Sequence, residues 1–449
     1  MLPIDNITSL LKELEVEQIY FCSGGRNASF LQILKENFKV EIVLNEASAA
    51  FMALGYGKSS QKPVVVCTTS GTAVAECFPA MVEAYYSNIP LIIISADRPE
   101  RLRFSHAPQA INQVEIFGEY ARSFVNLSDD KINIPSDVLF PLHINIEVDD
   151  RSPSDGKVNF LAAYKAPLII ISECAFITDT DMDMLKDLSA HVYIECLSNY
   201  KNLNLSNIIQ QEKIMLNNFA KNSYDVIIRI GRTPISKLWR VLDSSDSLVP
   251  VYTIGEFASG LSYESKINSL SDLDLSDSQL VAAVPISIQA TIAKYPSSEI
   301  AILTDIMNSL NKEDIVFVGN SMPIRYWQMI DTTENKILAS RGANGIDGQI
   351  ATAIGIARST RSKVHCIVGD LTFLYDLGVF VNSIPENLII HVLNNKGGRI
   401  FEQINLDQDI ILAHNLAVRD LIPTSSKHVF EYFVDNTETA LFWKDWNNA

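Results

Sequence analysis

The fold of this chain is indicated by KVHCIVGDLTF (residues 363–373) and NLIIHVLNNKGG (residues 387–398). Each begins with an apolar run and ends in turn-forming residues, Gly-Asp in the first stretch and Asn-Asn in the second. Because such runs lack polar alternation and helical patterns separate them, they predict strands of a parallel α/β sheet covered by helices on both faces. Similar runs occur earlier, at residues 18–25, 63–71, 90–99, 165–173, 191–197, 224–231 and 313–321.

The runs fall into three α/β series, which predict three domains. A chain of 449 residues is too long for one ordinary core. A Ser/Asp-rich stretch at residues 267–287 suggests a linker between the second and third series. We therefore expect domains at residues 1–163, 164–290 and 291–449. The most informative strand ends lie in the first and third, which suits a ligand that bridges two domains.

Charge and composition exclude several classes of function. The formal net charge is −17 and no Lys/Arg-rich run occurs, so we expect no nucleic-acid partner and no anionic-membrane surface. No apolar stretch approaches the ~20 residues that span a bilayer, and the N-terminal residues lack the basic region of a signal peptide. The six cysteines form no CxxC pair. These features favour a cytoplasmic protein with reduced, mostly buried thiols.

Asp370 and Asn395 offer oxygen ligands at the ends of the two quoted strands. Asp370 supplies a carboxylate, Asn395 an amide oxygen 25 residues later, and the Gly397 carbonyl can complete the protein side. Such ligands suit Mg²⁺ or Mn²⁺, which keeps other positions for water and phosphate. Helix N-termini nearby would favour the negative charge of a diphosphate. Taken alone, Asp and Asn at strand ends are weak evidence, because turns use both routinely.

Glu46 and Ile346 stand out on two further helical segments. Glu46 begins the pattern NEASAAFMALGYGKSS (residues 45–60) at a strand-to-helix transition. A single Glu on an amphipathic helix is usually a solvated charge, but small residues follow this one and leave space for a ligand. Ile346 lies in GANGIDG (residues 342–348), where an ordinary core position is an equally natural interpretation.

These motifs resemble those of thiamine-diphosphate-dependent enzymes, whose usual pattern is GDG followed about 25–30 residues later by NN. The third position is Leu371 here, a departure that 2-succinyl-5-enolpyruvyl-6-hydroxy-3-cyclohexene-1-carboxylate (SEPHCHC) synthases show. The chain resembles these synthases over nearly its whole length. The blocks that carry the resemblance lie at residues 69–103, 108–122, 319–325, 340–357 and 394–404.

The resemblance implies a transferase that binds thiamine diphosphate with Mg²⁺ or Mn²⁺. The glutamate at position 46 is then the catalytic residue, which hydrogen-bonds N1′ of the aminopyrimidine and must be shielded from water. The implied domains are pyrimidine-binding (1–163), central (164–290) and diphosphate- and metal-binding (291–449). The implied cofactor-binding residues are Glu46, Ile346, Gly369, Asp370, Leu371, Asn395, Ile400 and Phe401, and the implied metal ligands are Asp370, Asn395 and Gly397.

Substrates also follow from the resemblance. SEPHCHC synthases of menaquinone biosynthesis decarboxylate 2-oxoglutarate and add the succinyl unit to isochorismate by conjugate addition. Both substrates are dicarboxylates, for which arginine is the best-suited partner. The residues that match the donor-carboxylate positions are Ser321, Arg325 and Arg341. Those that match isochorismate-binding positions are Arg26, Arg98, Gln109 and Lys237.

On the acceptor side, three polar side chains of the family pattern are replaced. The usual PGSRS reads SGGRN here, so Gly25 and Asn27 replace two hydroxyl donors, and Leu238 stands where a basic residue is expected. The chain is also shorter than typical members. These departures leave open a related carboligase that keeps the 2-oxoglutarate donor and uses a different acceptor.

The sequence also bears on two other classes of protein and on the oligomeric state. A non-catalytic thiamine-fold binding protein is disfavoured because Glu46, Asp370 and Asn395 are all retained. Flavin-dependent relatives are disfavoured because the middle segment lacks a dinucleotide Gly fingerprint. In the family one chain supplies each half of a site, which implies a homodimer or homotetramer with active sites between chains.

Overall fold

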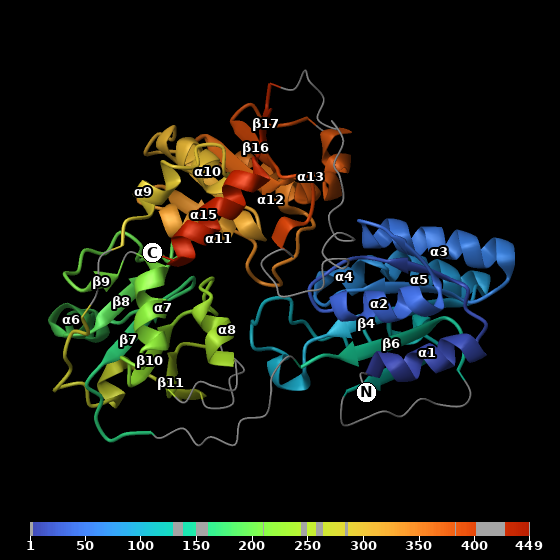
Figure 1. Cartoon of the computed structure of the whole chain (residues 1–449), viewed down its shortest axis with the longest axis horizontal. Coiled ribbons are helices and arrows are strands. Elements are labelled where there is room, and N and C mark those ends of the chain that lie inside the picture. Colours follow the sequence, from blue (N-terminus) through green and yellow to red (C-terminus); the bar gives the residue numbers. More distant parts are fainter. Residues whose placement is uncertain are drawn as a thin grey trace. The chain divides into compact units, whose positions relative to one another are not determined.

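The computed structural model describes residues 3–128, 138–149, 160–209, 211–243, 249–256, 264–282, 286–381, 383–400 and 427–448. Within these ranges the chain forms three sheets (Figure 1), and their strands pair in parallel. Helices pack against the sheets. The α/β fold predicted from the uninterrupted apolar runs is confirmed.

The first sheet has the strand order β2-β1-β3-β4-β6-β5. Successive side chains of a strand point to opposite faces, so Ile19 and Phe21 pack against α1 and α2, while Tyr20 and Cys22 pack against α3 and α5. The strands are β1 (Gln18–Phe21), β2 (Lys39–Ile42), β3 (Val64–Thr68), β4 (Leu91–Asp97), β5 (Ser123–Leu127) and β6 (Leu142–Glu147). The helices are α1 (Pro3–Glu13), α2 (Ala28–Asn37), α3 (Glu46–Ser60), α4 (Thr72–Glu76), α5 (Phe78–Ser87), η1 (Glu100–Leu102) and η2 (Gly118–Tyr120).

The second sheet has the order β12-β11-β10-β7-β8-β9. Leu270 and Leu275, within the stretch expected to be a linker, belong to its core, and Asp181 accepts the Leu270 N–H at 2.8 Å. The strands are β7 (Pro167–Ile171), β8 (His191–Ile194), β9 (Ile208–Ile209), β10 (Val226–Ile230), β11 (Val251–Ile254) and β12 (Glu264–Ile267). The helices are α6 (Asp179–Asp187), α7 (Glu212–Ala220), α8 (Leu238–Asp243) and η3 (Leu270–Asp272).

The third sheet has the order β14-β13-β15-β16-β17. Buried residues of α12 pack on one face of it, against Phe317, Cys366 and Ile390. The strands are β13 (Ile315–Val318), β14 (Lys336–Leu338), β15 (Val364–Gly369), β16 (Leu388–Asn394) and β17 (Val429–Phe433). The helices are α9 (Ile288–Ile292), α10 (Glu299–Asn308), α11 (Met322–Ile330), α12 (Gln349–Arg358), α13 (Asp370–Tyr375), η4 (Leu377–Val381) and α15 (Asn436–Asn448).

Two compact units make up the chain. One contains the first sheet together with Arg341–Asp347 and the described residues 396–400, and the other contains the second and third sheets with residues 427–448. The boundaries expected at residues 163/164 and 290/291 remain predictions.

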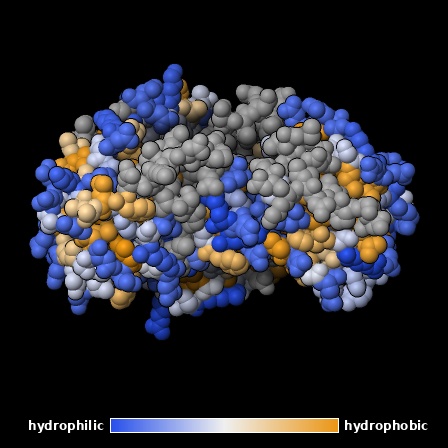
Figure 2. Space-filling view, turned by 90° about the horizontal axis from the view of Figure 1, so that it is seen from below, coloured by the Kyte–Doolittle hydropathy of each residue, from blue (hydrophilic) through white to orange (hydrophobic). Residues whose placement is uncertain are grey.

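The surface agrees with what composition implies. On the face drawn in Figure 2, hydrophilic residues predominate and hydrophobic residues occur in small groups, as is normal for a protein surface. Within the ranges that the structure describes, no helix is long and apolar enough to cross a membrane. Five cysteines are buried and Cys174 is exposed, and none of the six forms a disulfide.

Candidate active site

Two of the predicted metal ligands lie at one edge of the third sheet. Strands β15 and β16 pair in parallel with Gly369 opposite Leu393, so Asp370 and Asn395 follow directly on neighbouring strands. Both side chains are buried. Asp370 Oδ1 also accepts the backbone N–H of Leu371 at 2.7 Å. The structure thus places these predicted residues at adjacent carboxyl ends of parallel strands, where ligands of α/β sheets usually bind.

A second buried carboxyl group, that of Glu299, lies beside this pair. Its Oε2 accepts Asn395 Nδ2 at 3.3 Å. Burial raises the pKa of Glu299 to about 7 and the charge of Asp370 contributes, while the hydrogen bond from Asn395 opposes this rise. No motif points to Glu299. The sequence shows only that Ser298 and Glu299 form a typical helix start, where a glutamate is normally solvated.

The remaining predicted residues of this region follow Asn395. Gly397 has φ +121°, a left-handed conformation that glycine adopts readily, and its carbonyl accepts the Arg399 N–H at 2.7 Å. A carbonyl oxygen has two lone pairs and can therefore accept a second interaction. Ile400 is half-buried. Phe401 lies outside the described residues.

The donor set here fits a hard divalent cation. Among the described residues, no three His, Cys, Asp or Glu side chains gather closely enough to hold a metal. The Asp370 carboxylate and the Asn395 amide, both buried at neighbouring strand ends, offer a mixed set of oxygen atoms. Such a set suits Mg²⁺ or Mn²⁺, which leaves further positions for the oxygens of a diphosphate.

Glu46 is the first residue of α3 and is buried. Asn45 caps the helix, since its side chain accepts the Ser48 N–H at 2.9 Å. Burial raises the pKa of the Cys22 and Cys77 thiols well above their usual range, and the charge of Glu46 adds to both shifts. The carboxyl group therefore lies among buried side chains, shielded from water as the implied catalytic role requires.

Arg26 and Gln109, two of the residues predicted for the acceptor, meet at the carboxyl ends of the first sheet. Arg26 Nη1 donates to Gln109 Oε1 and to Ser70 Oγ, each at 3.3 Å. Gln109 has φ +56°, a backbone conformation that non-glycine residues adopt only when surrounding contacts hold them. The structure brings these two polar side chains together from loops 83 residues apart.

Asn27, which replaces an expected hydroxyl residue, is fully buried and bonded within its own loop. Its Nδ2 donates to the Cys22 carbonyl at 2.8 Å and its Oδ1 accepts the Gly24 N–H at 2.9 Å. A Cβ on Gly24 would lie 2.1 Å from Thr69 Cβ, so only glycine fits there. Asn27 therefore stabilises the loop, and its side chain does not stand in for a lost substrate contact.

Three hydroxyl groups near the same strand ends were not predicted. Within the described part of the chain, the side-chain oxygens of Ser23, Thr68 and Thr69 are buried and have no hydrogen-bond partner. Buried polar atoms normally find partners, so such groups mark positions where a bound molecule can supply them. Serine and threonine at strand ends are too common for the sequence alone to single them out.

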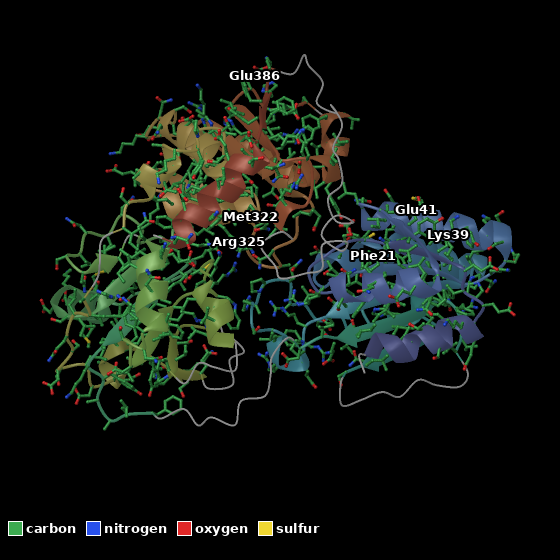
Figure 3. All side chains as sticks on the ribbon, in the orientation of Figure 1. Phe21, Lys39, Glu41, Met322, Arg325 and Glu386 are labelled. Atoms are coloured by element: carbon green, nitrogen blue, oxygen red, sulfur yellow. The ribbon has the colours of Figure 1, made fainter. Side chains whose placement is uncertain are left out.

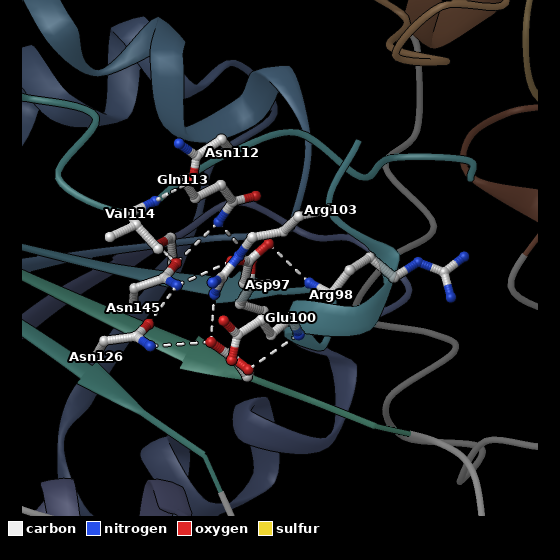
Figure 4. Close-up of polar contacts among 12 residues, drawn as sticks. Asp97, Arg98, Glu100, Arg103, Asn112, Gln113, Val114, Asn126 and Asn145 are labelled. Carbon is white, nitrogen blue, oxygen red and sulfur yellow. Dashed lines mark hydrogen bonds and ion pairs between the residues drawn. The ribbon is translucent and has the colours of Figure 1, made fainter. Parts of the chain in front are cut away.

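Arg98 extends away from a polar network that holds its strand end (Figure 4). Its Nε and Nη2 donate to the Pro108 carbonyl at 3.3 and 3.2 Å, and its backbone N–H donates to Asp97 at 2.7 Å. The carboxylate of Asp97 is paired with Arg103 at 3.7 Å. Burial raises the pKa of Asp97, against the hydrogen bonds from Asn145 and the Arg98 N–H and the charge of Arg103. The network thus fixes the backbone from which Arg98 projects.

The segment Arg341–Asp347 belongs to the first compact unit. The backbone N–H of Gln109 donates to the Ala343 carbonyl at 3.1 Å, and Thr72 Oγ1 donates to Asp347 Oδ1 at 2.7 Å. These contacts connect the segment to the start of α4 and to the loop that follows β4 and η1. The predicted residues on this segment are Arg341 and Ile346, both half-buried.

Ser321 and Arg325 lie at the start of α11, which follows β13. Figure 3 labels Arg325 and Met322, the first residue of this helix. Ser321 has φ +74° and occupies the N-cap position of the helix, where its side chain makes no capping hydrogen bond. Arg325 Nη1 donates to the Ser321 carbonyl at 2.5 Å, so two of the three residues predicted for the donor contact each other.

Lys237 lies near the same helix. Its Nζ lies 4.7 Å from the centre of the Trp443 ring, and Trp443 Nε1 donates to the Tyr326 hydroxyl at 3.0 Å. The next residue, Leu238, is a fully buried core residue at the start of α8, which explains why a basic side chain is not found there. The predicted acceptor residues are therefore divided between the two units, with Lys237 in the second and the other three in the first.

Comparisons with known proteins agree with these motifs. Residues 4–116 match the family described as "Thiamine pyrophosphate enzyme, N-terminal TPP binding domain". Among solved structures, benzoylformate decarboxylase from Polynucleobacter necessarius covers 100% of this chain and 97% of its own, at 15% identity and a TM-score of 0.42. That value is too low to support an argument, so the fold rests on the three parallel sheets themselves.

Curated relatives match along most of the chain. The 2-succinyl-5-enolpyruvyl-6-hydroxy-3-cyclohexene-1-carboxylate synthase of Bdellovibrio bacteriovorus is 34% identical, over 90% of this chain and 86% of its own length. The synthases of the same name from Akkermansia muciniphila and Bacillus pumilus are 32% and 29% identical, over 85% and 86% of this chain and 81% of each relative. The chain therefore belongs to the SEPHCHC synthase family of thiamine-diphosphate-dependent enzymes.

Proposed function

We propose that this protein is a SEPHCHC synthase, which decarboxylates 2-oxoglutarate and adds the succinyl unit to isochorismate in menaquinone biosynthesis. The observation that carries the proposal is the 34% identity to a synthase of this name over 90% of the chain. The burial of Glu46, Asp370 and Asn395 supports it, because these are the residues that the chemistry of the cofactor needs away from bulk water.

Thiamine diphosphate and a divalent cation are the cofactors of this family. When bound, thiamine diphosphate supplies the electron sink that lets the keto carbon of 2-oxoglutarate lose CO₂ and react as a nucleophile. Asp370, Asn395 and the Gly397 carbonyl would hold the cation, which in turn binds the diphosphate. Glu46 would hold and release a proton at N1′ of the aminopyrimidine, where its buried position excludes competing water.

On the donor side, Ser321, Arg325 and Arg341 would bind the distal carboxylate of 2-oxoglutarate. A guanidinium group matches a carboxylate with two parallel hydrogen bonds, which fixes orientation as well as charge. The contact of Arg325 with the Ser321 carbonyl supports this assignment, since it holds the arginine at the helix start.

On the acceptor side, Arg26, Arg98, Gln109 and Lys237 would bind isochorismate. The hydrogen bond between Arg26 and Gln109 supports a shared role for these two residues. One observation favours a second candidate, a carboligase with the same donor and a different acceptor. The Asn27 side chain hydrogen-bonds backbone groups of its own loop, and Leu238 is buried in the core. Neither residue therefore supplies the polar contact to the acceptor that the family pattern implies.

We also propose that the protein is cytoplasmic and forms a homodimer or homotetramer with active sites between chains. Glu46 and Asp370 belong to different compact units, which is compatible with a site that combines parts of two chains. Mixing Glu46→Gln and Asp370→Ala proteins tests this assembly. Activity that reappears in the mixture requires sites shared between chains, and a mixture as inactive as its components would contradict it.

Mass spectrometry of the products tests the reaction. Purified protein with thiamine diphosphate, Mg²⁺ and 2-oxoglutarate should form SEPHCHC only when isochorismate is added. Consumption of 2-oxoglutarate without this product, and a new adduct with another enol or aldehyde, would favour the second candidate. No consumption of 2-oxoglutarate under any condition would refute both.

A further inference from the structure

Two adjacent asparagines at the end of β16 are each bonded to a carboxylate. Asn394 is the last residue of β16 and Asn395 follows it, and their partners lie on different elements. Asn394 Nδ2 donates to Glu431 Oε1 of the neighbouring strand β17 at 2.6 Å. Asn395 Nδ2 donates to Glu299 Oε2, at the start of α10, at 3.3 Å. Only the second asparagine is an expected metal ligand, so the two pairs form a natural comparison.

Glu299 is held firmly in its position. Its side chain is buried, and its backbone N–H donates to Thr439 Oγ1 at 3.1 Å. The partner is held from the same segment, because Asn436 Nδ2 donates to the Asn395 carbonyl at 2.9 Å. The start of α15 therefore anchors both members of the Glu299–Asn395 pair.

The Glu299 carboxyl group determines which end of the Asn395 amide faces it. Asn395 Nδ2 donates to Glu299 Oε2, so the Glu299 carboxyl group binds the NH₂ end of the Asn395 amide. The oxygen of a planar amide then lies on the other side of the side chain. Asp370 follows the adjacent strand β15, is buried, and interacts electrostatically with Glu299. A cation held by Asp370 needs an oxygen from Asn395, because the NH₂ group cannot coordinate it.

We propose that Glu299 is a positioning residue of the metal site, which binds the NH₂ group of Asn395 and thereby presents the amide oxygen as the ligand. This inference rests on the proposed function, because it assumes that Asp370 and Asn395 hold the cation of thiamine diphosphate. Partners that orient metal ligands commonly affect metal affinity by about 10- to 100-fold when they are changed.

Mn²⁺ binding in the presence of thiamine diphosphate, followed by electron paramagnetic resonance, tests the proposal without measuring activity. Glu299→Met keeps the length of the side chain and removes the acceptor, and we expect Mn²⁺ affinity to fall about tenfold or more. Glu299→Gln keeps an acceptor oxygen, so affinity should return to within about threefold of wild type. A purely structural effect of lost packing would not be rescued in this way.

Matched controls use the neighbouring pair. Glu431→Met and Glu431→Gln change the carboxylate that binds Asn394, and both should bind Mn²⁺ within about twofold of wild type because Asn394 is no ligand. Thermal unfolding without metal shows whether each variant is folded. Should Glu299→Met fold poorly, Glu299→Ala removes the acceptor without adding a thioether, and the same loss is expected.

The outcomes separate this inference from the proposed function. Wild-type Mn²⁺ affinity in folded Glu299→Met or Glu299→Ala protein would overturn the role of Glu299, and so would an equal loss in Glu431→Met. Full Mn²⁺ binding by Asp370→Ala would remove the metal site itself. Normal Mn²⁺ binding by wild type without SEPHCHC formation would refute the proposed reaction and leave the role of Glu299 intact.

Discussion

Asn27 follows a strand of the first sheet and Asn395 follows a strand of the third, and both belong to sequence motifs of the family. Their side chains form different kinds of hydrogen bond. In the third sheet, the Asn395 amide is bonded to Glu299 from a separate helix, beside the carboxylate of Asp370. In the first sheet, both ends of the Asn27 amide are bonded to backbone groups of its own loop. An asparagine after a strand can therefore be available to bind a ligand or can stabilise its own turn. The hydrogen bonds of its side chain distinguish the two cases.

Removing the Asp370 carboxylate of the third sheet should affect cofactor binding most. Asp370→Ala leaves a methyl group that cannot coordinate a cation, so we expect Mg²⁺-dependent binding of thiamine diphosphate to weaken by more than about 100-fold. Isothermal titration calorimetry measures it. Glu386→Ala is the control, because this exposed carboxylate pairs only at the surface with Lys427. Undiminished affinity in Asp370→Ala would show that the metal site lies elsewhere.

Glu46, which follows the first sheet's strand β2, should affect proton transfer more than the binding of thiamine diphosphate. Glu46→Gln keeps the shape of the buried side chain but cannot exchange a proton in the same way, so we expect hydrogen exchange at C2 of bound thiamine diphosphate to slow by about 10²- to 10⁴-fold. Rapid-quench NMR measures the exchange. Glu41→Gln, at an exposed position on β2, is the matched control. Exchange at the wild-type rate in Glu46→Gln would reduce Glu46 to an ordinary helix-start residue.

The choice between 2-oxoglutarate and pyruvate tests the residues predicted to bind the donor. Arg341→Ala should lose activity with 2-oxoglutarate far more than with pyruvate, because pyruvate lacks the distal carboxylate. We expect the ratio of kcat/KM for the two donors to fall by at least about 100-fold. Arg361→Ala, an exposed arginine, is the control. An enzyme that prefers pyruvate before any substitution would show that the resemblance extends only to the cofactor and the fold.

Acid should destabilise both sheets through buried histidines. Burial lowers the pKa of His143 in the first sheet and His391 in the third to about 3, and the charge of His365 adds to the second shift. The unfolded chain takes up these protons near pH 6.5 and the folded chain does not, so the free energy of unfolding falls as pH drops from about 6.5 toward 3.

We expect a loss of about 2–3 kcal/mol per histidine by pH 4.5, and no effect of these groups above pH 7. Urea unfolding at a series of pH values measures the slope. His143→Gln stays neutral throughout and should flatten it. An unchanged slope in this variant would mean that other groups cause the acid sensitivity.

The smallest predicted effect tests the loop interpretation directly. Asn27→Ser restores the hydroxyl residue of the family pattern but shortens the side chain that bonds the Cys22 carbonyl and the Gly24 N–H. We expect the free energy of unfolding to fall by about 1–2 kcal/mol, with no gain in isochorismate affinity. Asn37→Ser, at an exposed position in the same unit, is the control. A large gain in affinity would show that the loop had merely lost a substrate contact.

The sequence by itself determined the fold class and the residue types at the cofactor site. Uninterrupted apolar runs predict parallel strands because a strand buried on both faces has no polar side, and this holds for all three sheets. Parallel strands end at the same edge of a sheet, so Asp370 and Asn395 could be expected together from spacing alone. The roles assigned to these residues, and to Glu46, remain predictions.

Only the tertiary structure decided what each polar side chain bonds. Glu299 lies 96 residues before Asn395, and nothing in a helix-start glutamate reveals that it will be buried against a strand end. Similarly, the stretch at residues 267–287, which the sequence predicts to be a linker, contributes Leu270 and Leu275 to the core of the second sheet. Periodicity reports which side of an element is apolar, whereas long-range hydrogen bonds depend on how separate elements pack, which local sequence does not encode.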